Sequence, residues 1–550
     1  MGKFEKFLNK YGWLLALILA IPTVLALLHL GFYGASDDLH PAWLYEMDRV
    51  LKAGIFPPRF VPDLSFGFGY PLFNFIYPFP FYLGEIFHLE GLSLVGSTKA
   101  VLFLGIPLSV AFMFAFLKKF MKSDLSLVGS LIYGYLPYRS TEIYVRGDIG
   151  EAFSFVFFPL ISLSVFELTK GNTKNRWRYI GLGGISVALL VLTHDIAAYM
   201  FLPFAVLLGI LFLVFIKPDR IKRVVNFILM FLLGALGSLY FWFPALTQSS
   251  LLKYSTVYDF QDYFLPVKRL ITPYFGYGGF PTMSFFIGFA AFVSIILGSI
   301  FLILLFRKIN QENRIIFLWA LITLLISLFM MNIRSTFIWN LVPLLPYFQF
   351  PWRFLTMVVF ISPIFLLGLN DIKFRVWIAL GIGILTIVTT ISYFHPQDYL
   401  ERTDSYYLAR YIPVPVVLPA YLTQDEEYLR LPEATEVRPT KDYPIAYTSG
   451  SEIKNIVAAT SLASVIRTDS TKSFTLNYSK YNFPGWNATV DGKSVQLSSG
   501  APFGQITINI PAGTHVINIF FRETILNTIL DILSLCTFLF CLGLAVRSKQ

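Results

Sequence analysis

The stretch IAAYMFLPFAVLLGILFLVFI, residues 196–216, determines the class of fold. It holds 21 residues without a charged side chain, and a helix of about 20 apolar residues crosses the hydrocarbon core of a bilayer. Similar apolar stretches recur along the 550 residues, which are 56% hydrophobic and only 14% charged. A water-soluble core could not bury that much apolar surface. The sequence therefore predicts a polytopic α-helical membrane protein.

The apolar stretches predict about twelve transmembrane helices, at residues 13–31, 96–117, 125–137, 151–168, 179–193, 196–216, 224–243, 284–306, 315–331, 354–370, 376–394 and 524–546. The connections between them alternate between short basic loops and long mixed segments. The short set holds 21 of the 43 Lys and Arg residues but only five of the 33 Asp and Glu residues. The positive-inside rule places this set, and with it both termini, in the cytoplasm. Because topology explains the net charge of +10, we expect no nucleic-acid partner.

A cleavable signal peptide is the alternative interpretation of the N-terminus. The chain begins with a basic stretch and an apolar run, followed by Gly34-Ala35-Ser36, which resembles a cleavage site. Removal of the first helix would break the alternation of basic and mixed loops, so we expect that helix to be retained.

Five long segments are predicted to face outwards, at residues 32–96, 138–150, 244–283, 332–353 and 395–523. Acids, arginines and aromatic residues cluster in them, whereas few charges fall inside the spans. A transporter would more often place its polar groups within the helices, near the midplane. The pattern favours chemistry at the membrane surface.

The last of these segments has the alternation of a β domain. Its apolar residues recur with a period of two, and Val490-Asp491-Gly492-Lys493 is typical of a hairpin with a two-residue turn. We expect an extracytoplasmic antiparallel β-sandwich or jelly-roll over residues 395–523. A membrane module then covers residues 1–394, and a final helix with a cytoplasmic tail covers 524–550. Trp486 either stacks on a sugar ring or, as is more common, fills the inside of its own sandwich.

Two adjacent acids, Asp37 and Asp38, follow the first predicted span almost immediately. A carboxylate just above the bilayer can act as a general base towards a hydroxyl or hold a divalent cation, and partial desolvation raises its pKa towards a useful value. The alternative is a solvated loop with a helix N-cap, because Ser or Asp before Pro41 starts a helix well. The residues alone leave both interpretations open.

The segment RGDIGE, residues 146–151, stands at the entry to the fourth predicted span. Asp148 and Glu151 are three residues apart, so they share one side of a helix. They could join Asp38 around a divalent metal ion, Mg²⁺ or Mn²⁺, or cap the helix as acids near its positive end. Capping does not explain why a glycine-flanked acid pair stands beside Arg146.

Several basic residues on the same face are candidates for binding a phosphate: Arg59, Arg139, Arg146, Lys253, Lys268, Arg269, Arg334 and Arg353. Arg353 lies at the mouth of the tenth span, where a guanidinium can bind a phosphate through two parallel bonds. Snorkelling to lipid headgroups is the alternative for most of this set. His194, at a predicted tight turn between two helices, could contact a phosphate or make an interhelical hydrogen bond.

The same residues resemble a known group of enzymes. The chain is similar to the GT-C superfamily of polytopic glycosyltransferases and, within it, to the membrane proteins called 6-pyruvoyl-tetrahydropterin synthase-related and to YfhO-type proteins. The matching stretches are SDDLH (36–40), RGDIGE (146–151), THD (193–195), FQFPWRF (348–354) and the run NFPGW…VDGK…IPAGTH (482–515). No Walker loop, dinucleotide fingerprint, HExxH or GxSxG motif is present, which argues against ATPases, dehydrogenases, zincins and serine hydrolases.

The resemblance implies an enzyme that takes a sugar from a polyprenyl-phosphate carrier and passes it to a glycan, glycolipid or other acceptor on the outer face of the membrane. It implies Asp38, with Asp37 close behind, as the acid at the reaction centre. Asp148 or Glu151 would assist by orienting the acceptor or by holding a metal ion.

Among the basic residues, the resemblance implies that Arg353 stabilises the departing lipid phosphate, with Arg146, Lys253 and His194 as further candidates for binding it. It leaves dependence on a divalent metal open, since donors with one phosphate often react without one.

The expected setting is a prokaryotic plasma membrane, where the protein would contact membrane lipids and act in glycan biosynthesis for the cell envelope. Two alternatives use the same residues. A transporter or lipid-carrier flippase would line its pathway with them, and a non-catalytic cell-envelope assembly protein would use the β domain as its binding element. Convergence of Asp38, Asp148 and Arg353 on one cavity would favour the enzyme.

Overall fold

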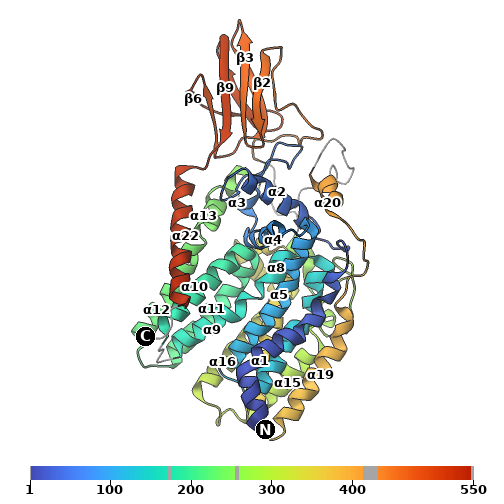
Figure 1. Cartoon of the computed structure of the whole chain (residues 1–550). Coiled ribbons are helices and arrows are strands. Elements are labelled where there is room, and N and C mark those ends of the chain that lie inside the picture. Colours follow the sequence, from blue (N-terminus) through green and yellow to red (C-terminus); the bar gives the residue numbers. More distant parts are fainter. Residues whose placement is uncertain (1, 171–174, 254–258, 413–431, 547–550) are drawn as a thin grey trace.

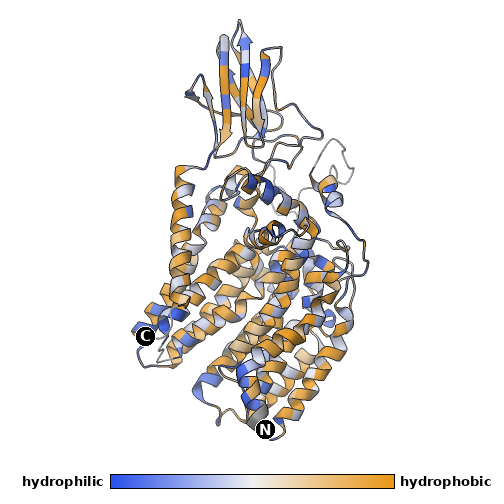
Figure 2. Cartoon of the chain, in the orientation of Figure 1, coloured by the Kyte–Doolittle hydropathy of each residue, from blue (hydrophilic) through white to orange (hydrophobic). Residues whose placement is uncertain are grey.

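The computed structural model describes residues 2–170, 175–253, 259–412 and 432–546. A helical bundle makes up most of the molecule, and a β domain stands at one end of it (Figure 1). Both ends of the chain lie away from the β domain. Apolar residues cover most of the bundle helices, and hydrophilic residues gather in the β domain and at the ends of the helices (Figure 2).

Helices occupy all twelve segments predicted to span the membrane. They are α1 (Gly2–Ala20) continued by η1 (Ile21–Leu28), α5 (Leu94–Leu117), α6 (Ser123–Tyr135), α8 (Ile149–Ser154) continued by α9 (Phe157–Thr169), α10 (Arg176–Thr193), α11 (Asp195–Phe215), α12 (Arg220–Gly237) followed by α13 (Leu239–Thr247), α15 (Phe289–Leu304), α16 (Gln311–Met330), the series η7 (Pro351–Phe354), α18 (Leu355–Ile361) and η8 (Ser362–Leu369), α19 (Arg375–Thr390), and α22 (Ile525–Val546).

Within the described ranges, eight helices are long and apolar enough to cross a membrane. The number is nine if α12 and α13, which meet at a bend of 69°, form one span. Helices α6 and α15 are shorter, and α10 begins with a stretch that holds two arginines. The prediction of many membrane helices is confirmed, and the number of about twelve stays a prediction.

Close packing of α10 depends on small residues. A Cβ atom at Gly181 would lie 2.4 Å from the carbonyl oxygen of Cys541 in α22, and one at Gly183 would lie 2.2 Å from the Sδ atom of Met230 in α12. Glycine therefore lets three helix backbones approach one another, as in other membrane bundles. The chain turns back at His194, the single residue between α10 and α11.

A layer of short helices, with α2 (His40–Lys52), α3 (Leu72–Phe75) and α4 (Phe79–Leu89), lies between the bundle and the β domain (Figure 1). Other short helices are α7 (Pro137–Ser140), the π-helical turn η2 (Thr141–Arg146), α14 (Val267–Ile271), α17 (Thr336–Leu341) and α20 (Asp404–Tyr411). These helices come from the long segments predicted to face outwards, so the described parts of those segments contain regular structure.

The β domain is a sandwich of two antiparallel sheets, as predicted. Its strands are β1 (Ala446–Tyr447), β2 (Ile453–Thr460), β3 (Ala463–Ser470), β4 (Phe474–Tyr481), β5 (Trp486–Val490), β6 (Lys493–Val495), β7 (Ser498–Gly500), β8 (Gln505–Ile510) and β9 (Gly513–Phe521). One sheet has the order β1-β4-β8-β7 and the other β2-β3-β9-β5-β6. The predicted hairpin joins β5 to β6, and Asp491 and Gly492 have the positive φ angles, 50° and 79°, that such a turn requires.

Trp486 lies inside the molecule and also fastens the β domain to the layer of short helices. Its side chain is buried between Tyr478 and Phe521 of the sandwich, and Phe60 of the first loop meets it edge-on at 5.4 Å. Lys480 adds hydrogen bonds from Nζ to backbone carbonyls of the same loop. The expectation that this tryptophan fills its own sandwich is confirmed.

A second polar attachment, which we call the anchor cluster, joins the first loop to α22. Its centre is Arg59, whose side chain is 3% exposed. Arg59 pairs with Glu523 at 3.0 Å, with Asp531 of α22, and donates from Nη1 to Asn74 at 3.0 Å. Asn74 in turn donates to Gln248 at 2.6 Å. The cluster explains how a charge of the first loop can be buried at the start of the last helix.

Candidate active site

A cavity of about 530 Å³ opens where the layer of short helices meets the bundle. Aromatic side chains form much of its wall: Trp43, Tyr70, Phe75, Tyr77, Tyr263, Phe280, Tyr347, Phe350 and Trp352. The titratable side chains in the wall are Asp37, His40, Arg146, Asp148, His194, Asp195 and Arg353, besides the tyrosines. A largely apolar pocket with a few convergent polar groups is the usual form of a site for a small ligand.

Backbone pairing brings the first loop against the turn η2. The amide of Asp37 donates to the carbonyl oxygen of Arg146 at 2.7 Å. Gly147 ends η2 with a φ of +71°, and a Cβ atom there would lie 2.8 Å from the Cβ of Ala35. Glycine is therefore needed both for the left-handed backbone and for the close approach of the two segments. This contact places Asp37 beside Arg146, although 109 residues separate them in the chain.

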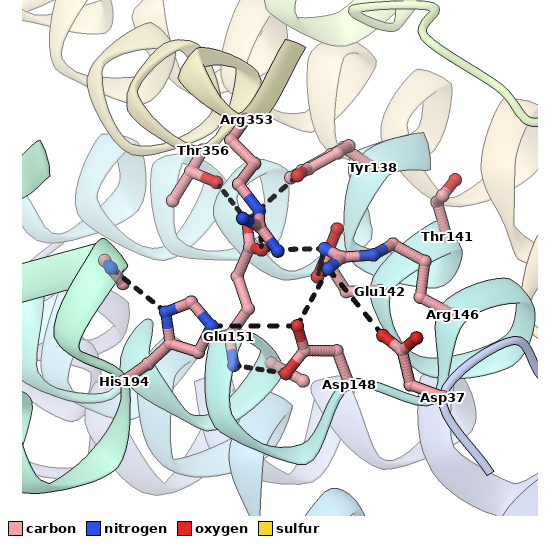
Figure 3. A network of polar contacts seen from close by, with 12 residues as sticks. Asp37, Tyr138, Thr141, Glu142, Arg146, Asp148, Glu151, His194, Arg353 and Thr356 are labelled. Carbon is pink, nitrogen blue, oxygen red and sulfur yellow. Dashed lines mark hydrogen bonds and ion pairs between the residues drawn. The ribbon is translucent and has the colours of Figure 1, made fainter. Parts of the chain in front are cut away.

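An ion-pair network is centred on Glu151, whose side chain is 1% exposed, and it reaches the cavity through Arg146, Asp148 and Arg353 (Figure 3). Its Oε1 accepts hydrogen bonds from Tyr138 at 2.9 Å and Thr356 at 3.0 Å. Its Oε2 accepts from Nη1 of Arg146 at 2.7 Å and lies 3.3 Å from Nε of Arg353. Because both oxygens already have two partners, Glu151 holds two guanidinium groups in place and is unsuited to accept a proton.

Asp148 has both roles that the sequence left open for it, since it caps a helix and pairs with an arginine. Its Oδ1 accepts from the backbone N–H of Glu151 at 2.8 Å, at the start of α8, and its Oδ2 accepts from Nη2 of Arg146 at 2.8 Å. Burial alone would raise the pKa of Asp148, but the charge of Arg146 holds it well below the ordinary value of an aspartate. Asp148 is therefore a carboxylate at neutral pH.

Glu142 completes the network, and it is not among the site residues predicted from the sequence. Its side chain is fully buried and its Oε2 accepts from Nη1 of Arg146 at 2.6 Å. Burial raises the pKa of Glu142 to about 8, although Arg146 acts in the opposite direction. Arg146 and Arg353 form ion pairs with the other two buried acids, Asp148 and Glu151.

Arg353 lines the cavity and is held from within the protein. Its side chain is 7% exposed, its Nη1 donates to the carbonyl oxygen of Phe348 at 2.8 Å, and its guanidinium lies 5.0 Å from the ring centre of Phe350. Within the described residues its Nη2 makes no hydrogen bond. A buried, fixed guanidinium of this kind is not snorkelling to lipid headgroups, and its remaining N–H groups are placed for an anionic ligand.

The two neighbouring acids of the first loop lie in different surroundings. Asp37 lines the cavity, with its Oδ2 3.8 Å from Nη2 of Arg146 and its side chain 26% exposed. Asp38 does not line the cavity, because its carboxylate accepts from Nη1 of Arg402 at 2.7 Å and from the hydroxyl of Tyr411. The structure thus brings Asp37, rather than the expected Asp38, to the cavity that holds Asp148 and Arg353.

His194 caps α11 and faces the network from the side. Its Nδ1 accepts from the backbone N–H of Ala197 at 3.0 Å, so the proton of the neutral ring resides on Nε2, which lies 3.8 Å from Asp148. Its ring centre lies 5.0 Å from that of Tyr77. The imidazole therefore presents an N–H group to the acids of the cavity.

By spacing alone, Asp148, Glu151 and His194 could hold a metal ion, since one ligand atom of each lies within 4.8 Å of the others. Their hydrogen bonds do not fit that role. Oε1 of Glu151 accepts two hydrogen bonds, and Oε2 accepts one and lies 3.3 Å from Nε of Arg353. Nε2 of His194 carries the proton that a metal ligand must lose. Arg146 and Arg353 supply the positive charge at this place, so the donor set fits guanidinium groups better than Mg²⁺ or Mn²⁺.

The remaining basic candidates lie outside the cavity. Lys253 donates from Nζ to the carbonyl oxygen of Thr435 at 2.5 Å, and Arg59 belongs to the anchor cluster.

Three residues of the network are not predicted from the sequence. The position of Glu142 gives a local sequence signal, since it stands four residues before Arg146 on one helical turn. Tyr138 and Thr356 had none, because their position in the network depends on helices that meet only in the folded chain.

Comparison with known proteins finds no matching family model and no matching curated protein. Among solved structures, the arabinofuranosyltransferase AftD from Mycobacteria aligns with 70% of this chain at a TM-score of 0.48 and 13% identity. The oligosaccharyltransferase AglB from Archaeoglobus fulgidus, in complex with an inhibitory peptide and a dolichol-phosphate, aligns with 79% at a TM-score of 0.46 and 16% identity. The chain spans 28% of the length of AftD and 62% of that of AglB. These TM-scores lie below 0.5, so the chemistry of the cavity carries the functional conclusion.

Proposed function

We propose that this chain is a glycosyltransferase of the GT-C type, which moves a sugar from a polyprenyl-phosphate-linked donor to a glycan or glycolipid acceptor. One observation carries the proposal. An acid of the first loop, Asp37, and two fixed guanidinium groups, of Arg146 and Arg353, meet in one aromatic-lined cavity at the ends of apolar helices. A lipid-linked donor requires its reactive phosphate at such a place, between the bilayer and water.

In the proposed reaction Asp37 accepts the proton of an acceptor hydroxyl, and the oxygen forms a bond to the anomeric carbon of the donor sugar. The bond between that carbon and the phosphate oxygen breaks, and its electron pair leaves with the polyprenyl phosphate. A positioned general base contributes about 10²–10⁴-fold to such a step. Arg353 donates to the phosphate as its charge grows, and preorganised donors of this kind contribute several kcal/mol.

The other network residues position these groups. Glu151 fixes both guanidinium groups, and Asp148 pairs with Arg146 while it caps α8. The acids at the cavity, Asp37 and Asp148, suit the positive charge that develops on a sugar ring as the bond to the leaving group stretches. The proposed chemistry needs no metal ion.

The proposed setting is the plasma membrane, with both termini in the cytoplasm and the β domain outside. The distribution of Lys and Arg residues over the short loops supports this orientation. We also propose the division into a membrane module at residues 1–394, a β-rich segment at 395–523 and a final helix with its tail at 524–550.

A transfer assay tests the proposal. The full chain, in vesicles of defined lipid, is supplied with a panel of radiolabelled polyprenyl-phosphate sugars and membrane extract as the source of acceptor. We expect one donor to yield labelled glycan or glycolipid with wild-type protein and no labelled product with Asp37→Asn. If every donor stays intact, or crosses the bilayer unchanged, the proposal is wrong and a flippase or an assembly protein replaces it.

A further inference from the structure

A second cavity, of about 500 Å³, lies where the β domain meets the layer of short helices. Its floor is apolar, with Phe483, Trp486 and Leu251. Amide and hydroxyl side chains of the domain complete the wall: Asn482, Asn487, Thr489, Ser494 and Ser499. We call it the β-domain pocket.

The β-domain pocket lies at the open edges of the sandwich. Among the described strands, β6 is the edge of one sheet and β7 the edge of the other, and both contribute residues to the pocket. Edge strands carry backbone N–H and C=O groups that have no partner within their sheet. Both edges therefore lie next to the amides and hydroxyls of the pocket.

The two cavities share their walls. Leu251 lines the β-domain pocket, and the next residue, Leu252, lines the candidate active site. Phe483 of the β-domain pocket meets Phe75 of the active-site wall edge-on, at 6.2 Å between ring centres. One layer of side chains thus separates the two, so a chain-like ligand that occupied both would pass around this layer and not through it.

The rim of the β-domain pocket is fastened to the membrane module. The amide of Glu433 donates to the carbonyl oxygen of Leu251 at 2.8 Å, and Lys253 donates to the carbonyl oxygen of Thr435 at 2.5 Å. The pocket therefore has walls from both parts of the chain. Lys253, predicted as a phosphate ligand, helps to hold this rim.

The chemistry of the wall selects the class of ligand. Glu433 is the only charged side chain in it, and no lysine, arginine or histidine of the described residues contributes. A phosphate or another anion would find no cationic partner there. Phe483 and Trp486 are 4% and 6% exposed, so they back the pocket rather than offer an open ring face. An apolar floor with amides and hydroxyls around it suits the apolar face and the hydroxyl groups of a neutral sugar.

We infer that the β-domain pocket binds a neutral saccharide unit of the acceptor, so the acceptor is an oligosaccharide chain rather than a single sugar. The inference rests on the proposed function, because it assigns the acceptor of that reaction. The growing end would lie beside Asp37, and an earlier unit of the same chain would lie in the β-domain pocket.

Binding of defined oligosaccharides tests the inference without catalysis. Neutral oligosaccharides of one to six units are titrated into the full chain in detergent, with Asp37→Asn as the background so that no product forms. We expect an affinity that rises with length, and a Kd that rises about fivefold or more when Asn482→Ala and Asn487→Ala remove two amides from the wall. Asn455→Ala, on the exposed strand β2 and outside the pocket, is the matched control and should leave the Kd unchanged.

Two results would overturn the inference: no binding of any oligosaccharide in the panel, or a Kd that the paired Asn482 and Asn487 substitutions leave unchanged. Either could occur while the transfer assay still succeeds, in which case the proposed function stands and its acceptor is small. Oligosaccharide binding with the predicted loss, but without transfer from any donor, would instead support the pocket and reject the enzyme.

Discussion

The cavity network and the anchor cluster are built from the same kinds of residue at the same end of the bundle. Each places a nearly buried arginine between acids, with Arg146 and Arg353 in the first and Arg59 in the second. The anchor cluster closes on itself, since Arg59 is satisfied by Glu523, Asp531 and Asn74 and lines none of the cavities described above. The cavity network opens onto about 530 Å³ of aromatic-lined space.

This difference shows that a cluster of charged residues at the end of a membrane helix is not by itself evidence of a catalytic site. What distinguishes the cavity network is an acid with a partly exposed side chain, Asp37, and a guanidinium with an N–H group left over, on Arg353. Substitutions in the cavity network should therefore reduce activity more than stability. Substitutions in the anchor cluster should do the reverse.

The largest effect is expected for Asp37→Asn, which removes the proposed base while it keeps the shape of the side chain. The rate of sugar transfer should fall by about 10²–10⁴-fold. Asp38→Asn is the matched control, because Asp38 pairs with Arg402 and Tyr411 away from the cavity, and its rate should stay within about tenfold of the wild type. The opposite ranking of the two variants would return Asp38 to the role of base.

Arg59→Ala should break the anchor cluster. It leaves Glu523 and Asp531 without their cation, and removal of one partner from a largely buried pair costs about 3 kcal/mol. Thermal unfolding of the purified variant in detergent should show a lower midpoint, while the transfer rate per folded molecule stays near that of the wild type. A normal midpoint with lost transfer would place Arg59 in the catalytic machinery.

Arg353→Lys keeps a positive charge but removes the planar fork that can hold two phosphate oxygens. The transfer rate should fall by about tenfold or more, with little change in the thermal midpoint, since Arg146 still pairs with Glu151. A lower midpoint without a change in rate would show that Arg353 is only structural.

Glu142→Gln tests the charge balance of the cavity network. Because burial raises the pKa of Glu142 from 4.5 to about 8, the folded state retains a proton that the unfolded state loses. The contribution of Glu142 to the free energy of unfolding is complete below pH 4.5 and is lost as the pH rises towards 8. The wild-type midpoint should therefore fall between pH 5 and pH 8, whereas the Gln variant, which cannot lose a proton, should show a smaller fall. Equal pH dependence in both proteins would contradict a protonated Glu142.

The smallest effect is expected from metal removal. Arg146 and Arg353 already pair with the carboxylates of Asp148 and Glu151 that would otherwise bind a metal ion. Incubation with EDTA should therefore change the transfer rate by less than about twofold. Loss of activity in EDTA that Mg²⁺ or Mn²⁺ restores would show that the acids bind a metal in the working enzyme.

The sequence predicts much of the fold because its signals are local. The uncharged run at 196–216 forms α11, and Asp491-Gly492 forms the hairpin turn, since each depends on neighbours in the chain. The cavity is different. Asp37 faces it and Asp38 does not, because Asp38 is held by Arg402, which is 364 residues away and gives no signal near Asp38. The buried state of Glu142 likewise depends on helices that surround η2 only after folding.

Product stoichiometry tests the central claim most directly. With the preferred donor in excess and the full chain in vesicles, the amount of polyprenyl phosphate released is measured against the amount of sugar joined to acceptor. Transfer at the cavity predicts one polyprenyl phosphate for each sugar transferred, and neither product with Asp37→Asn. Movement of intact donor across the bilayer without release of polyprenyl phosphate would contradict the account.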